Sequence, residues 1–178
     1  MNNKYSAAYL NLEHKFQNNE CVVLDGAIAT ELQALSNDDF RLSDAEHWGF
    51  KALQRAPDTV SKVHASYVEA GCDVITTNTY GILQAPREKI SEQAAGSAAT
   101  HWLDYARTAL QLSHGAIESA SRLESCATAF SIGGDVASKE DLRTLELLLR
   151  VFSEQAPDVV LFETLLMIRT ITHVKQSE

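Results

Sequence analysis

The chain has 178 residues, 45% of them hydrophobic, which is enough to bury the core of a single domain spanning residues 1–178. Its formal net charge of −9 argues against a nucleic-acid partner, because nucleic-acid binding normally requires a basic face. The longest apolar stretch, 159–168, is interrupted by Glu163 and is too short to span a membrane, and the N-terminus lacks the pattern of a secretion signal. The three cysteines show no CxxC spacing, so the composition predicts a cytoplasmic protein without a disulfide framework.

Four short apolar runs predict buried strands, because each is rich in apolar residues and is bounded by glycine, proline or polar residues. In chain order they are 22–24, 73–76, 126–132 and 159–162. Helical periodicity fills the segments between and after them. The predicted helices run from Pro57 to near Gly71, lie within 91–115, follow a cap at Ser138, and begin again near Leu165. Strands that alternate with helices predict parallel βαβ units.

This alternation leaves two architectures open, a doubly wound open sheet and part of a barrel. A doubly wound sheet that binds a nucleotide carries a glycine-rich turn after its first strand. The turn after the first run, 25–29, contains one glycine only. The sequence therefore lacks a nucleotide-binding fingerprint.

Polar residues follow each predicted strand. They are Asp25, the segment 77–80, the segment 133–135, and the pair Glu163-Thr164. In parallel α/β folds the carboxyl ends of the strands form the active site, so we expect these residues to face one mouth. A carboxylate at a buried strand end is costly without a partner. Asp25 and Glu163 would hold an ammonium group, a metal or a proton, or else they only cap a turn and a helix start.

The cysteines and histidines predict no metal site. Cys21, Cys72 and Cys126 lie at the opposite ends of the strands, and we expect them to be small thiols in the core. His64 lies near the apolar stripe of the helix that begins at Pro57, where a packed or capping histidine is expected. The other histidines show no metal-ligand spacing.

Several blocks of the sequence resemble the homocysteine S-methyltransferase family. They are 24–32, Trp48, 57–60 with His64, 70–80, 131–134 and 158–165, and they occur in the order of the family. The resemblance implies an α/β fold of TIM type, a parallel (β/α)8 barrel. A complete barrel needs about 250 residues. We therefore expect the chain to be the N-terminal half, with about four βα units.

The resemblance also implies a transferase that moves a methyl group from a donor to the thiol of homocysteine and forms methionine. Zinc would remove the thiol proton, since the thiolate is the nucleophile. The implied substrate-binding residues are Asp25, Gly26, Ala27, Trp48, Tyr80, Glu163 and Thr164. The two carboxylates would hold the amino group of homocysteine, and the backbone N–H groups of Gly26 and Ala27 would meet its carboxylate.

The sequence departs from the family in its cysteines. Members of the family bind zinc through three cysteines of the second half of the barrel, including an adjacent pair, and no adjacent pair occurs here. We therefore predict no metal ligand and no catalytic residue in this chain, with little turnover by the chain alone. Two open strand edges would favour a fragment, or a half-barrel that self-associates.

Two other functions stay open from the sequence. One is a non-catalytic, amino-acid-binding remnant, and the other is a barrel lyase that uses Asp25 and Glu163 on a divalent metal. The methyl donor is also left open. The segment after Gly134 lacks the longer loop of family members that use S-methylmethionine.

Overall fold

The computed structural model describes residues 5–35, 52–83, 102–134 and 136–164. Within these residues, three parallel strands form one sheet in the order β1-β2-β3. The strands are β1 (Val74–Thr76), β2 (Ala127–Gly133) and β3 (Val159–Glu163). The helices are α1 (Ala7–Gln17), α2 (Ile28–Leu35), α3 (Ala52–Arg55), α4 (Pro57–Ala70), α5 (Trp102–Ser119) and α6 (Lys139–Glu154). The parallel α/β class is confirmed, and none of the described helices is long and apolar enough to cross a membrane.

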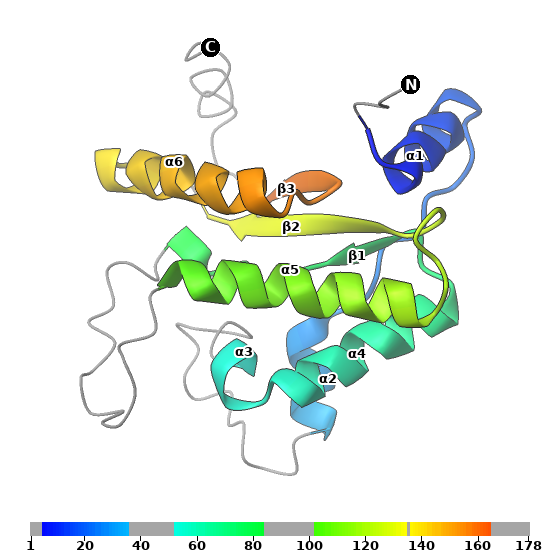
Figure 1. Cartoon of the computed structure of the whole chain (residues 1–178), viewed down its shortest axis with the longest axis horizontal. Coiled ribbons are helices and arrows are strands. Elements are labelled where there is room, and N and C mark those ends of the chain that lie inside the picture. Colours follow the sequence, from blue (N-terminus) through cyan, green and yellow to red (C-terminus); the bar gives the residue numbers. More distant parts are fainter. Residues whose placement is uncertain (1–4, 36–51, 84–101, 135, 165–178) are drawn as a thin grey trace.

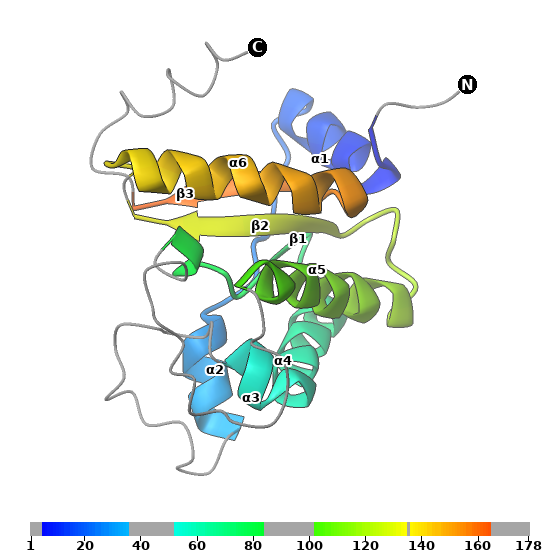
Figure 2. The ribbon, with the colours of Figure 1, turned by 60° about the vertical axis from the view of Figure 1, so that its left-hand side comes forward.

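The two faces of β2 carry different side chains and pack against different helices. Phe130 and Ile132 belong to the largest apolar cluster, which includes residues of α4, α5 and α6. Ala127 and Ala129 point to the other face, where they pack with residues of α1. In Figures 1 and 2, α5 and α6 run alongside β2, and α1 stands near the end where β2 begins. The second face is therefore covered at the amino ends of the strands, and its carboxyl end carries the pocket described below.

Three of the four predicted strands are confirmed, with bounds shifted by one residue at most. The prediction of a strand at 22–24 is wrong, because this segment makes only an isolated parallel bridge from Leu24 to Val74. The backbone N–H of Val23 donates to the side chain of Asp73 at 2.9 Å rather than to a neighbouring carbonyl. The ladder therefore does not extend, although the segment still lies beside β1.

The helix signals at Pro57, Gly71 and Ser138 are confirmed. Pro57 opens α4, and Gly71 ends it in the left-handed conformation with φ of 100°. Ser138 caps α6 in a reciprocal capping box with Asp141. The helix predicted within 91–115 is observed as α5, which continues past the predicted end to Ser119. Its part before residue 102 and the helix predicted from Leu165 lie outside the described residues.

Candidate functional site

A pocket of about 400 Å³ opens at the carboxyl ends of the strands. Its walls come from the segment before and into α2, the segment after β1, and the ends of β2 and β3. The lining residues are Gly26, Ala27, Ile28, Ala29, Thr76, Thr77, Asn78, Tyr80, Ser131 and Glu163. The structure therefore brings together four segments that are far apart in the sequence, as expected for parallel strand ends.

Asp25 is held beside this pocket by Thr76. Its carboxylate accepts hydrogen bonds from the backbone N–H of Thr76 at 2.8 Å and from the Thr76 hydroxyl at 3.1 Å. Burial raises the pKa of Asp25 to about 6, and the negative charge of Glu163 adds to this rise while the Thr76 hydrogen bonds oppose it. At neutral pH the site therefore holds two carboxylates that repel each other, and a cation between them would relieve the repulsion.

Glu163 ends β3 opposite Gly133 of β2. Its side chain accepts a hydrogen bond from the hydroxyl of Ser131. Its carbonyl oxygen accepts the backbone N–H of Gly134 at 3.3 Å and the hydroxyl of Thr164 at 2.8 Å. Both the side chain and the backbone of Glu163 are therefore fixed by neighbours at the end of the sheet.

Ser131 is itself held by a closed ring of hydrogen bonds. Its N–H donates to the Thr77 hydroxyl at 3.1 Å, and its carbonyl accepts from the Thr79 hydroxyl at 2.7 Å. The two threonine hydroxyls are 2.6 Å apart, and since Thr79 donates to Ser131, Thr77 donates to Thr79. All three residues are buried. This ring leaves the Ser131 hydroxyl free to orient Glu163.

Tyr80 and Thr164 form the rim of the pocket near Glu163. The Tyr80 hydroxyl lies 2.6 Å from the hydroxyl of Thr164, and its ring lies over Gly133. A Cβ at Gly133 would come within 2.2 Å of the Tyr80 ring, so only glycine fits beneath it. Thr164 has φ of 54°, a left-handed conformation that is uncommon for a β-branched residue.

Gly26 and Ala27 lead directly into α2. The Ala27 carbonyl accepts the N–H of Glu31 at 3.2 Å, so Ala27 stands at the start of the first turn. The ring of Tyr67 packs against Gly26, where a Cβ would lie 2.7 Å from the tyrosine oxygen. Backbone N–H groups at the start of a helix favour an anion, so this wall of the pocket suits a carboxylate.

The structure thus brings six of the seven predicted site residues together. Asp25, Gly26, Ala27, Tyr80, Glu163 and Thr164 lie at or beside the mouth, and Trp48 lies outside the described residues. The prediction missed Ser131 and Thr76, which orient the two carboxylates. A signal for Ser131 was available, because small residues alternate along β2 at 127, 129, 131 and 133.

The described residues do not fit a zinc ion. No three His, Cys, Asp or Glu side chains within them come close enough to hold a metal. Cys72 and Cys126 are buried at the amino ends of the strands, as predicted for core thiols, and lie away from the pocket. The same prediction is wrong for Cys21, which is exposed in the connection after α1.

His64 is packed in the protein interior, as predicted. It is fully buried on α4, and neither of its ring nitrogens has a hydrogen-bond partner in the part of the chain that the structure describes. Burial lowers its pKa to about 4, so the ring is neutral at neutral pH.

Fold and pocket together define an α/β protein with a polar site at the carboxyl ends of parallel strands. A family model described as homocysteine S-methyltransferase matches residues 22–178, and the chain belongs to this family. Homocysteine S-methyltransferase 2 of Zea mays is 30% identical over 166 residues, which cover 81% of this chain and 48% of that protein. Homocysteine S-methyltransferase 4 of Zea mays is 47% identical over 60 residues, or 34% of this chain and 16% of that protein.

A solved structure shares the fold. The homocysteine methyltransferase MmuM of Escherichia coli, in its metallated form, aligns with a TM-score of 0.67 and 20% identity. The alignment covers 93% of this chain and 61% of MmuM. The chain spans about half the length, or less, of the two maize relatives that it matches.

Proposed function

We propose that this chain forms the homocysteine-binding half of a homocysteine S-methyltransferase with a TIM-type barrel. The observation that carries the proposal is a pair of carboxylates at the carboxyl ends of the strands. Glu163 lines the pocket, and Asp25 lies beside it, close enough for the charge of Glu163 to raise its pKa. Family membership supports the substrate, and the likeness to MmuM supports the barrel. In the whole enzyme the thiol of homocysteine takes a methyl group and becomes the thioether of methionine.

In the proposed complex the ammonium group of homocysteine lies between the two carboxylates. Charge-assisted hydrogen bonds of this kind are about twice as strong as neutral ones. The carboxylate of homocysteine lies against the N–H groups of Gly26 and Ala27 at the start of α2. Tyr80 and Thr164 complete the mouth.

Activation of the thiol is not assigned to the described residues. In a family member that uses zinc, the metal would activate the thiol of homocysteine by lowering its pKa. Because no described cluster suits a metal, the role of this part of the chain is to bind and orient the amino acid. Membership of the methyltransferase family disfavours the lyase alternative, in which Asp25 and Glu163 would hold a metal. The half-barrel is proposed to complete its sheet by association, because β3 is an edge strand in the described sheet and Val160 is 38% exposed.

Calorimetric titration of the chain with L-homocysteine tests the proposal. We expect saturable binding, and Asp25→Asn weakens it by about tenfold or more, since a hydrogen bond to a charged group contributes about 1.5–3 kcal/mol. Glu118→Gln is the matched control, because Glu118 is an exposed carboxylate at the C-terminal end of α5 and does not line the pocket. Absence of binding by the unmodified chain, or an equal affinity of the Asp25→Asn variant, would contradict the proposal.

A further inference from the structure

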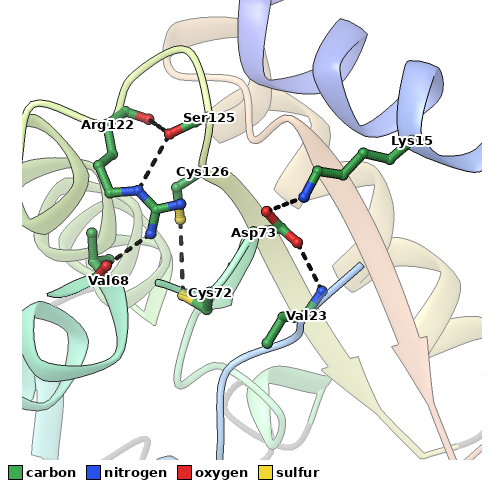
Figure 3. A network of polar contacts seen from close by, with 8 residues as sticks. All are labelled: Lys15, Val23, Val68, Cys72, Asp73, Arg122, Ser125 and Cys126. Atoms are coloured by element: carbon green, nitrogen blue, oxygen red, sulfur yellow. Dashed lines mark hydrogen bonds and ion pairs between the residues drawn. The ribbon is translucent and has the colours of Figure 1, made fainter. Parts of the chain in front are cut away.

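Two buried cysteines meet at the amino ends of β1 and β2, on the opposite end of the sheet from the pocket. The sulfur atoms of Cys72 and Cys126 lie 4.0 Å apart and are hydrogen-bonded. Cys72 follows α4 and precedes β1, and Cys126 directly precedes β2. Their side chains point toward each other in Figure 3. Two thiols this close differ from an isolated core thiol, because each is within reach of the other's chemistry.

The two segments that carry these cysteines are tied together by Arg122. Its guanidinium donates to the carbonyl of Val68 in α4 at 2.8 Å and to the hydroxyl of Ser125 at 3.2 Å (Figure 3). The backbone N–H of Cys126 donates to the carbonyl of Arg122 at 2.9 Å. The arginine therefore keeps the end of α4 beside the turn that enters β2, and the two sulfur atoms stay near each other.

We propose that Cys72 and Cys126 are a modification site, at which a peroxide converts the two thiols into an intrachain disulfide. The site is independent of the proposed methyltransferase function. A disulfide needs sulfur atoms about 2.05 Å apart. The observed 4.0 Å leaves a gap that side-chain rotation and a small shift of the two turns close.

The reaction balances with one peroxide for each pair of thiols. The thiolate of Cys72 attacks a peroxide oxygen, the O–O bond breaks, and a sulfenic acid and hydroxide form; the hydroxide takes up the proton that the Cys72 thiol released and becomes water. The sulfur of Cys126 then attacks this sulfenic sulfur, the S–O bond breaks, and the second water leaves. The two sulfur atoms together lose two electrons, and both thiol protons end in water.

Cys72 is assigned the first step because of its surroundings. Cys72 is 4% exposed, whereas Cys126 is 1% exposed. The hydrogen bond from Cys126 lowers the pKa of the Cys72 thiol, and the positive charge of Arg122 contributes to this effect. The hydrogen bond and burial together raise the pKa of Cys126. A thiolate therefore forms more easily at Cys72, which also stands nearer to solvent.

The disulfide would link residues that are 54 positions apart in the sequence. A cross-link of this span restricts the unfolded chain and stabilises the folded one. Because the link lies at the amino ends of the strands, it leaves the pocket residues in place. We therefore expect oxidation to raise the thermal stability without changing the affinity for a ligand of the pocket.

The test uses the full chain with Cys21→Ser, which removes the exposed thiol and leaves only the buried pair. After treatment with millimolar hydrogen peroxide, both thiols are expected to disappear together in the monomer. Tryptic peptides 63–87 and 123–139 should then be recovered as one cross-linked species, which dithiothreitol separates. The oxidised chain should melt about 5 °C higher or more.

The control is the Cys21→Ser, Cys72→Ser double variant, in which Cys126 should keep its thiol under the same treatment. If the double variant does not fold, peptide mapping of the Cys21→Ser chain alone shows whether the disulfide between Cys72 and Cys126 forms. Two free thiols after treatment would overturn the proposal. It would also be overturned by a sulfinic acid at Cys72 with Cys126 still free, or by disulfides that form only between chains.

Discussion

The ionisation of Asp25 controls the charge of the pocket. Its pKa is raised to about 6 by burial, with a contribution from Glu163. Below that pH the Asp25 carboxyl group is mostly neutral, so it attracts an ammonium group less strongly. We therefore expect the affinity for homocysteine to increase as the pH rises from about 5 to about 7, by up to tenfold for each pH unit below the pKa. Calorimetry at the two pH values measures this change.

The Asp25→Asn variant is the control for this pH dependence. It removes the titrating group and should bind weakly, with nearly the same affinity at both pH values. An equally steep pH dependence in the variant would mean that another group governs binding.

His64 makes the folding stability depend on pH. Burial lowers its pKa to about 4, whereas an unfolded chain has the ordinary value of about 6.5. Between these values the unfolded state binds the extra proton, so the free energy of unfolding falls as the pH falls. The expected loss approaches about 2 kcal/mol between pH 6.5 and 4.5.

Replacing His64 by leucine should remove this part of the pH dependence, because leucine has no proton to gain and no buried nitrogen to satisfy. Urea unfolding at several pH values measures it. A slope that stays the same in the His64→Leu variant would contradict the assignment to His64.

At the scale of elements, the end of β2 depends on Gly133. A methyl group there would overlap the ring of Tyr80, so Gly133→Ala should displace Tyr80 from Thr164 and lower the free energy of unfolding by about 1–3 kcal/mol. Gly81→Ala is the matched control, since a Cβ at Gly81 meets nothing within 4 Å. Equal stability of the two variants, measured by denaturant unfolding, would argue against the observed packing of Tyr80.

α1 is attached to the sheet through a partly buried ion pair. Lys15 lies 2.7 Å from Asp73, whose other oxygen accepts the N–H of Val23. Burial alone would raise the pKa of Asp73, but these hydrogen bonds lower it instead. Asp73→Ala would leave both donors without their acceptor, and should cost about 2–3 kcal/mol of stability.

The matched control for Asp73 is Glu20→Ala, an exposed carboxylate that follows α1. It should change the free energy of unfolding by less than about 0.5 kcal/mol. If the two substitutions prove equally mild in urea unfolding, the Asp73 pair does not hold α1.

The sequence predicts three of the strands correctly but not the segment 22–24 or the helix α1, and each difference has a physical reason. β1, β2 and β3 were predictable because buried parallel strands are short apolar runs. The segment 22–24 has the same composition, but a hydrogen bond to the side chain of Asp73 interrupts its pairing, and no local pattern indicates that. α1 was missed because it buries only Ala8 and Leu12, so its apolar stripe is weak, although Ser6 caps it.

At the scale of the whole molecule, the position of the site in the fold was predictable, but the hydrogen bonds that orient its side chains were not. Asp25 and Glu163 were expected to meet, since parallel strands bring their carboxyl ends to one edge. The role of Ser131 depends on which face of β2 its side chain points to and on the ring it forms with Thr77 and Thr79. Those contacts join residues more than 50 positions apart and appear only in the folded chain.

The arrangement of the layers explains why the pocket is where it is. α4, α5 and α6 contribute to the apolar cluster on one face of the sheet, and α1 covers the amino end of the other. What remains of the second face carries small and hydroxyl side chains and ends in Glu163. The proposed half-barrel thus contains the groups that we propose to bind an amino acid, and the described part holds no cluster of three side chains that could bind a metal ion.

A comparison of homocysteine with 4-mercaptobutanoate, which differs only by lacking the amino group, tests whether Glu163 binds the ammonium group. Calorimetry on the unmodified chain and on the Glu163→Gln variant gives the four affinities of a cycle. We predict that the unmodified chain prefers homocysteine by about tenfold or more, and that Glu163→Gln removes most of this preference while hardly changing the affinity for 4-mercaptobutanoate. Equal affinity for both ligands, or an equal loss for both in the variant, would contradict the assignment of Glu163 to the ammonium group.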